Sequence, residues 1–235
     1  MAAFERAVAD KADGIEFDIR LTADCQWVVH HDAAISVGGE PLRIADLSAT
    51  DIAKLSVGPS KAPIPTLAGF LDWAKTKGIQ LTLDIKDRTG MTELIATVEA
   101  ADLPIAPVFS SFHKSVIRKL RTQRPEWQSA LIVGNPRWRF MRRLLTGAVL
   151  RWAATHQLYG LSLHERWVTP SLVHKAQNEG INIAVWTADD PARMSMLALL
   201  GVDAIITNRP DSGRETIDSL LETEAVTGET DAGDD

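Results

Sequence analysis

Acidic side chains alternate with apolar ones in two short segments of the sequence. In GIEFDIR, Glu16 and Asp18 stand two residues apart, and in QLTLDIK, Asp84 and Lys86 do the same. Because successive side chains of a strand point to opposite faces, each pair shares one face, opposite isoleucine, leucine or phenylalanine. Burying an uncompensated carboxylate costs several kcal/mol at least. A cation must therefore lie near these three acids.

An all-oxygen ligand set is typical of a hard divalent cation such as Ca²⁺ or Mg²⁺, whereas Zn²⁺ prefers His or Cys. We therefore predict a site for one divalent cation at Glu16, Asp18 and Asp84, with Lys86 neutralising part of the charge. The alternative is that the three acids are strand-end caps or members of surface ion pairs.

Two further segments carry side chains that can act on a bound anion. The sequence WVVH ends in His30, and His31 and Asp32 follow it. A histidine beside an anion held by a metal is a natural proton donor or acceptor near neutral pH, although a histidine can equally be a hydrogen-bonded structural residue. Trp186, at the end of NIAVW, either lines a pocket or fills the protein interior.

Apolar segments of strand length alternate with amphipathic segments of helix length. The candidate strands are residues 14–19, 27–30, 80–85, 106–110, 130–133, 160–163, 182–186 and 204–207. The candidate helices between them are residues 67–77, 91–101, 114–124, 137–154, 170–178 and 191–200. This alternation, without a linker rich in Gly, Pro and Ser, predicts one α/β domain with a parallel sheet.

The repeat of roughly 20 to 30 residues is typical of one βα step in a TIM (β/α)8 barrel. Residues 27–30 follow the first strand too closely for a parallel crossover, so we expect an antiparallel hairpin there. Seven barrel strands remain, and an amphipathic helix over residues 1–12 precedes them. We therefore predict an α/β TIM barrel that lacks its first strand in this sequence. Either the start codon has been placed too late, which we favour, or the barrel is open.

Composition excludes several classes of protein. The chain has 235 residues, 45% of them hydrophobic, and one cysteine, Cys25. A single thiol cannot build a disulfide framework or a Cys-based zinc site, and no apolar run is long enough to span a bilayer. No secretion signal is visible, so we expect a cytoplasmic protein unless an export signal lies upstream of Met1.

The net charge of −6 is concentrated at the C-terminus. Residues 222–235 contain six acids and no bases, and few apolar side chains that could offset the entropy of ordering. We expect a barrel domain over residues 1–221 and a disordered acidic tail over residues 222–235.

Taken in order, these segments resemble the glycerophosphodiester phosphodiesterase family. The resemblance extends over residues 2–211 and is carried by ADGIEFDIRLTAD followed by WVVHHD, by IPTLAGFLDWAKTKGIQLTLDIK, by FSSF, by INIAVWTADDPARM and by LGVDAIITNRPD. It implies a metal-dependent phosphoric diester hydrolase that cleaves a small-molecule glycerophosphodiester to glycerol 3-phosphate and an alcohol.

The resemblance also implies roles for individual residues. The ligands of one divalent cation, Ca²⁺ or Mg²⁺, would be Glu16, Asp18 and Asp84. His31 would be catalytic, because it would transfer a proton to or from the departing alkoxide. Lys86 would contact the phosphate, and Trp186 would border the alcohol end of the substrate.

Three departures from the family pattern leave other functions open. The His-Arg-Gly motif of the family's first strand and its Glu-Asn-Thr motif do not occur here, so half of the proton-transfer pair is missing from this sequence. Asp84 stands where the family usually has Glu, and Cys25 where Gly is usual. The alternatives are a lipid phosphodiesterase similar to lysophospholipase D and an inactive barrel that binds phosphodiesters.

A basic segment suggests a further partner. Residues 114–151 contain ten bases and one acid, Glu126. This segment either makes a weak contact with an anionic membrane surface or is the solvated side of outer barrel helices, which is the interpretation we favour. No recognised nucleic-acid-binding motif accompanies the charge, so we expect no nucleic-acid partner. The oligomeric state is left open.

Overall fold

The computed structural model describes residues 1–55, 62–135 and 139–230, with side chains described over 1–55, 62–135 and 145–222. The chain forms two compact units. The first contains residues 1–5 and 13–132, and the second contains residues 6–12 and 133–235. Helix α1 (Ala2–Ala9) crosses from one unit to the other. The predicted domain boundary at residue 221 stays a prediction.

The first unit is built on a sheet with the strand order β2-β1-β5-β6-β7. Its strands are β1 (Gly14–Leu21), β2 (Trp27–Val29), β5 (Gln80–Ile85), β6 (Val108–Ser111) and β7 (Ser129–Val133). β1, β5, β6 and β7 run parallel, and β2 pairs antiparallel with the C-terminal half of β1. The predicted hairpin after the first strand is confirmed.

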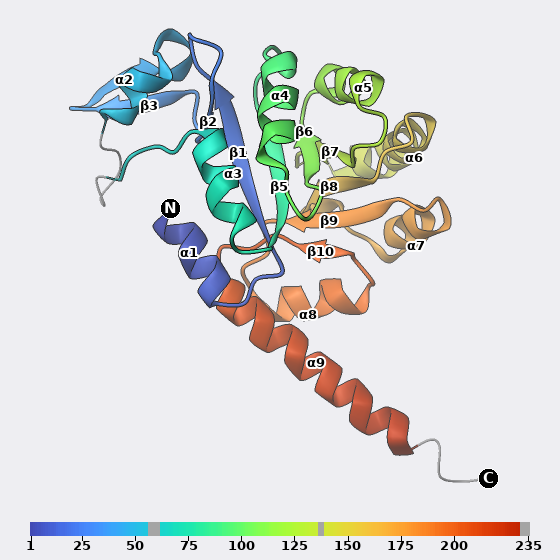
Figure 1. Cartoon of the computed structure of the whole chain (residues 1–235). Coiled ribbons are helices and arrows are strands. Elements are labelled where there is room, and N and C mark those ends of the chain that lie inside the picture. The colour runs from blue at the N-terminus through green and yellow to red at the C-terminus, as the bar shows by residue number, and fades with distance from the viewer. Residues whose placement is uncertain (56–61, 136–138, 231–235) are drawn as a thin grey trace. The chain divides into compact units, whose positions relative to one another are not determined.

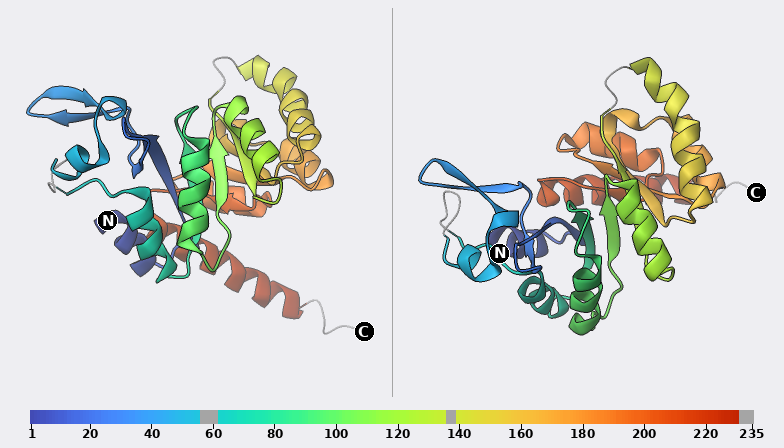
Figure 2. Two further views of the ribbon diagram at one scale, coloured as in Figure 1. Left: turned by 45° about the horizontal axis from the view of Figure 1, so that its top comes forward. Right: turned by 90° about the horizontal axis from the view of Figure 1, so that it is seen from above.

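Helices follow these strands along the chain (Figure 1). They are α3 (Leu67–Lys75), α4 (Met91–Ala101) and α5 (Lys114–Gln123). α3 begins where the Thr66 hydroxyl accepts a hydrogen bond from the Gly69 amide, a standard N-terminal cap. A small hairpin of β3 (Ala34–Val37) and β4 (Glu40–Arg43) precedes η1 (Ile44–Asp46) and α2 (Ala49–Ala53), and Figure 2 shows it extending away from the sheet.

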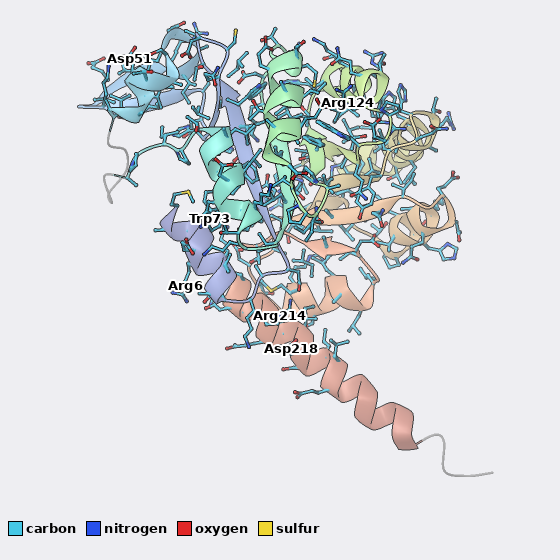
Figure 3. The ribbon with its side chains drawn as sticks, viewed as in Figure 1. Arg6, Asp51, Trp73, Arg124, Arg214 and Asp218 are labelled. Carbon is cyan, nitrogen blue, oxygen red and sulfur yellow. The ribbon has the colours of Figure 1, made fainter. Side chains whose placement is uncertain are left out.

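Aromatic packing explains why the acids of β1 lie on the face of the strand that points away from α3. Phe17 is 3% exposed and packs against Phe70 of α3, with ring centroids 4.3 Å apart. The ring centroids of Phe4 and Phe70 are 4.6 Å apart. Trp73, labelled in Figure 3, donates its indole N–H to Glu5 at 2.6 Å. Burial of the apolar face of β1 against α3 therefore fixes the orientation of the alternate residues.

The second unit repeats the same alternation. Its elements are α6 (Arg139–Thr155), β8 (Gly160–His164), η2 (Glu165–Trp167), α7 (Pro170–Asn178), β9 (Asn182–Trp186), α8 (Pro191–Leu199), β10 (Ala204–Ile205) and α9 (Pro210–Thr230). β8, β9 and β10 pair in parallel. The described part of the chain thus has seven parallel strands, as predicted: β1, β5, β6 and β7 in the first unit and β8, β9 and β10 in the second.

The C-terminus differs from the expectation. Helix α9 runs to Thr230, so it continues through nine residues of the segment expected to be a disordered tail. The segment LETEA is rich in strong helix formers, which allow a helix that starts at Pro210 to propagate. Residues 231–235 lie outside the described part. None of the helices in the described ranges has both the length and the apolar character needed to cross a bilayer.

Candidate active site

Three carboxylates meet at one point of the first unit. Asp18 of β1 and Asp84 of β5 are direct partners in the parallel register, and Glu16 lies one pleat earlier on the same face of β1. One oxygen atom from each of the three side chains lies within 4.8 Å of the other two. The predicted convergence of these acids is therefore present, and the surface-cap alternative is disfavoured because Asp84 is only 3% exposed.

Lys86 provides one positive charge to this triad of acids. Its Nζ lies 2.7 Å from Asp18 Oδ1 and also pairs with Asp84 Oδ2. Nζ is 5.3 Å from the centroid of the Phe112 ring, which is 43% exposed. Burial alone would lower the pKa of Lys86, but its hydrogen bonds to Asp18 and Asp84 raise that pKa. Lys86 therefore remains charged.

One ammonium does not neutralise three carboxylates, and the pKa values show the deficit. Burial, followed by the charges of Asp18 and Asp84, raises the pKa of Glu16 to about 8. Burial also raises the pKa of Asp84 to about 6, against the lowering effect of Lys86. The metal-free site thus disfavours the ionised form of two of its acids.

The residues of the triad fit a bound cation. Asp84 Oδ1 is buried and has no hydrogen-bond partner among the described residues. A buried polar atom of this kind needs a ligand, and the donors around it are all carboxylate oxygens, as a hard divalent cation requires. Glu16, Asp18 and Asp84 can therefore hold an ion.

Both histidines line a cavity together with two acids of the triad. A cavity of about 240 Å³ is lined by Phe4, Glu16, Phe17, Asp18, Val29, His30 and His31. His30 continues the pairing of β2, since its amide donates to the Asp18 carbonyl at 3.0 Å. The His31 side chain is 72% exposed, and its Nδ1 lies 2.8 Å from Asp32 Oδ1. The structure thus brings His31 to the same cavity as Glu16 and Asp18, while its catalytic role stays a prediction.

Sequence reasoning missed Arg20 as part of this region. Its guanidinium donates two hydrogen bonds to the His31 carbonyl oxygen, from Nε at 3.0 Å and from Nη2 at 2.9 Å. The signal was present, because Arg20 continues the alternation of Glu16 and Asp18 along the same strand.

Trp186 lies in the second unit, at the end of β9. Its ring packs edge-on against His164, with ring centroids 5.2 Å apart. A contact between Trp186 and the alcohol end of a substrate stays a prediction.

The basic segment over residues 114–151 is described only in part. On α5, Lys114 and Arg118 are exposed. Arg124, which follows α5 and is labelled in Figure 3, pairs with Glu99 through its Nε at 2.8 Å. The side chains of residues 136–144, which include four of the ten bases, lie outside the described residues. A membrane contact through this segment stays a prediction.

The chain is similar to known proteins in sequence and in structure. A glycerophosphodiester phosphodiesterase from Caldanaerobacter subterraneus subsp. tengcongensis is 28% identical over 227 residues, which cover 90% of this chain and 88% of that protein. A solved glycerophosphodiester phosphodiesterase from Parabacteroides distasonis has a TM-score of 0.79 at 24% identity and covers 93% of this chain and 89% of its own.

A phosphodiesterase from Oleispira antarctica, solved in complex with the product sn-glycerol 3-phosphate, has a TM-score of 0.81 at 20% identity and covers 92% of this chain and 90% of its own. These likenesses confirm the predicted TIM-barrel class. The model of the glycerophosphoryl diester phosphodiesterase family matches residues 1–212. The chain therefore belongs to the glycerophosphoryl diester phosphodiesterase family.

Proposed function

We propose that this chain hydrolyses glycerophosphodiesters to glycerol 3-phosphate and an alcohol, with one divalent cation, Ca²⁺ or Mg²⁺, held by Glu16, Asp18 and Asp84. The observation that carries the proposal is the convergence of these three carboxylates, with Asp84 Oδ1 buried and without a partner in the described part of the chain. The product bound to the Oleispira antarctica phosphodiesterase supports the choice of substrate class.

Each side chain around the triad has a task in this reaction. When bound, a divalent cation supplies charge stabilisation at the phosphoryl oxygens. Lys86 lies next to the same carboxylates, so its ammonium can donate a hydrogen bond to a phosphate oxygen. The P–O bond to the alcohol breaks, a new P–O bond to a water oxygen forms, and one proton of that water passes to the solvent. Glycerol 3-phosphate and a free alcohol result.

His31 is placed to supply the proton that the departing alkoxide needs. Its Nδ1 is hydrogen-bonded to Asp32, which leaves Nε2 for the reacting atoms. The hydrogen bond from His31 lowers the pKa of Asp32, so Asp32 is an ionised acceptor for the His31 ring. His31 thus acts as the general acid, with Asp32 orienting the ring.

The proposal is tested by measuring release of glycerol 3-phosphate from glycerophosphocholine in a coupled dehydrogenase assay. We expect release to stop in EDTA, to return on addition of excess Ca²⁺ or Mg²⁺, and to be lost in Glu16→Gln. Glu93→Gln, which changes an exposed acid of α4, is the matched control and should retain activity.

Release that is insensitive to EDTA would contradict the role of the metal. Metal binding without turnover on any glycerophosphodiester would instead support the binding barrel, and turnover restricted to lysophospholipids would support the lipid phosphodiesterase. A cytoplasmic location stays a prediction.

A further inference from the structure

Arg20 joins three segments around the triad of acids. It lies near the C-terminal end of β1, two residues beyond Asp18. Its Nε and Nη2 both donate to the His31 carbonyl oxygen, at 3.0 and 2.9 Å, so the planar guanidinium holds that oxygen with two donors. Nη1 lies 3.5 Å from Oδ1 of Asp87, in the loop that follows β5.

Asp87 is itself fixed to β1. Its Oδ2 accepts a hydrogen bond from the Leu21 amide at 2.9 Å, which leaves Oδ1 facing the Arg20 guanidinium. The Arg20 side chain is 19% exposed and that of Asp87 is 32% exposed. The guanidinium is therefore held between a carboxylate and a backbone carbonyl in a partly desolvated position, where charge-assisted hydrogen bonds are strong.

Among the described residues, His31 has few other contacts that could define its position. Strand β2 ends at Val29, and in the described part of the chain the His30 amide makes the last backbone–backbone hydrogen bond to β1. The His31 imidazole is 72% exposed and bonds to Asp32, whose side chain is 74% exposed. The position of the imidazole therefore depends on how firmly the His31 backbone is held.

We propose that Arg20 is a positioning residue for His31: by holding the His31 carbonyl, it keeps the imidazole where it can deliver a proton. This inference rests on the proposed function, because it presupposes that His31 acts on the leaving group. Arg20 itself need not touch the substrate. A misplacement of about 1 Å in a catalytic group can reduce a rate by about 10²-fold.

The test compares steady-state kinetics on glycerophosphocholine for wild type, Arg20→Ala, Arg20→Lys, His31→Ala and the double variant Arg20→Ala/His31→Ala. We expect Arg20→Ala to lower kcat by about 10- to 100-fold with KM within about 3-fold of wild type. Arg20→Lys should recover part of the loss, since an ammonium can donate to one carbonyl but lacks the guanidinium fork.

The double variant separates positioning from general support of the fold. In the His31→Ala background, Arg20→Ala should lower kcat by less than about 3-fold, because the group that it positions is already gone. A glycerophosphodiester with a p-nitrophenyl leaving group should reduce the loss in Arg20→Ala, since p-nitrophenolate departs without a proton. Arg118→Ala removes an exposed arginine of α5 and should behave as wild type.

Each result decides between named explanations. Wild-type kcat in Arg20→Ala, or losses from Arg20 and His31 that multiply in the double variant, would overturn the positioning role. If Arg20→Ala does not fold, the same comparison is made with Arg20→Lys, which should show a smaller loss that again disappears in the His31→Ala background. Absence of turnover in the wild-type protein would contradict the proposed function itself. If the wild-type protein is active, His31→Ala is impaired and Arg20→Ala is not, only the positioning role of Arg20 is contradicted.

Discussion

Binding of a divalent cation to the triad should displace a proton near neutral pH. The cause is the pKa of Glu16, which burial and the charges of Asp18 and Asp84 raise to about 8. A metal binds the carboxylate and not the carboxylic acid, so a proton must leave when the ion arrives. The perturbation to study is therefore pH, at fixed total metal.

The magnitude follows from the two raised pKa values. At pH 7, a group with a pKa of about 8 is roughly 90% protonated and one with a pKa of about 6, as for Asp84, is roughly 10% protonated. Metal binding should then release about one proton, and the apparent Kd should fall about tenfold per pH unit around neutrality and level off above about pH 9.

Stability should follow the same linkage. Folding raises the pKa of Glu16 from its ordinary 4.5 to about 8 and that of Asp84 from 3.8 to about 6. At a pH between the ordinary and the raised pKa of each group, the folded state therefore holds more protons than the unfolded chain. Without metal, the free energy of unfolding should decrease as pH rises from about 4 to about 8, by on the order of 5 kcal/mol for Glu16 if its shift is fully expressed. Saturating metal should flatten or reverse this slope.

Titration calorimetry in two buffers of different ionisation enthalpy measures the released protons directly, and urea unfolding in EDTA measures the stability. Glu16→Gln should weaken metal binding and abolish most of the proton release at pH 7, whereas the control Glu93→Gln should retain both. A Kd that does not change between pH 6 and pH 8, or binding without proton release, would show that Glu16 is not protonated in the metal-free site.

Three other perturbations test separate parts of the structure. His31→Ala should lower kcat for glycerophosphocholine by about 10²-fold or more, which is the scale of a general acid. The circular dichroism spectrum should not change, because the His31 side chain is 72% exposed. Unchanged turnover would contradict the catalytic role of His31. Lys86→Met should raise the pKa of Asp84 further and raise KM for the diester, and an unchanged KM would exclude a phosphate contact. Phe70→Ala should lower the free energy of unfolding by about 3 to 5 kcal/mol in urea titrations, because Phe70 is 0% exposed and packs on Phe17. A loss below about 1 kcal/mol would show that this packing contributes little to stability.

Hydrophobic periodicity predicted the elements that carry the site. β5 and β9 have the predicted bounds, and so do α4 and α7, because each of these elements is a strongly patterned segment between clear breaks in the sequence. The same period of two placed Glu16 and Asp18 on one face, and the register then set Asp84 directly opposite Asp18. Local pattern was sufficient here, since it fixes which face of a strand is buried.

Other features depend on contacts that local pattern does not contain. The β3–β4 hairpin turns at two glycines with positive φ, and its strands are only four residues long, so periodicity gave no clear signal. The bond between Arg20 and the His31 carbonyl joins residues eleven positions apart through the β1–β2 hairpin. The raised pKa of Glu16 arises from burial and from the charges of Asp18 and of Asp84, the latter on another strand. These features are consequences of tertiary structure.

The central claim is that Glu16, Asp18 and Asp84 share one ion that binds the scissile phosphodiester. The most direct measurement is an anomalous difference map from crystals soaked with Mn²⁺ and sn-glycerol 3-phosphate. We expect a single peak with oxygen ligands from all three carboxylates at about 2.0 to 2.6 Å and with a phosphate oxygen completing the shell. Phosphate bound elsewhere, or a map without a peak while Lys86 still bridges Asp18 and Asp84, would contradict it.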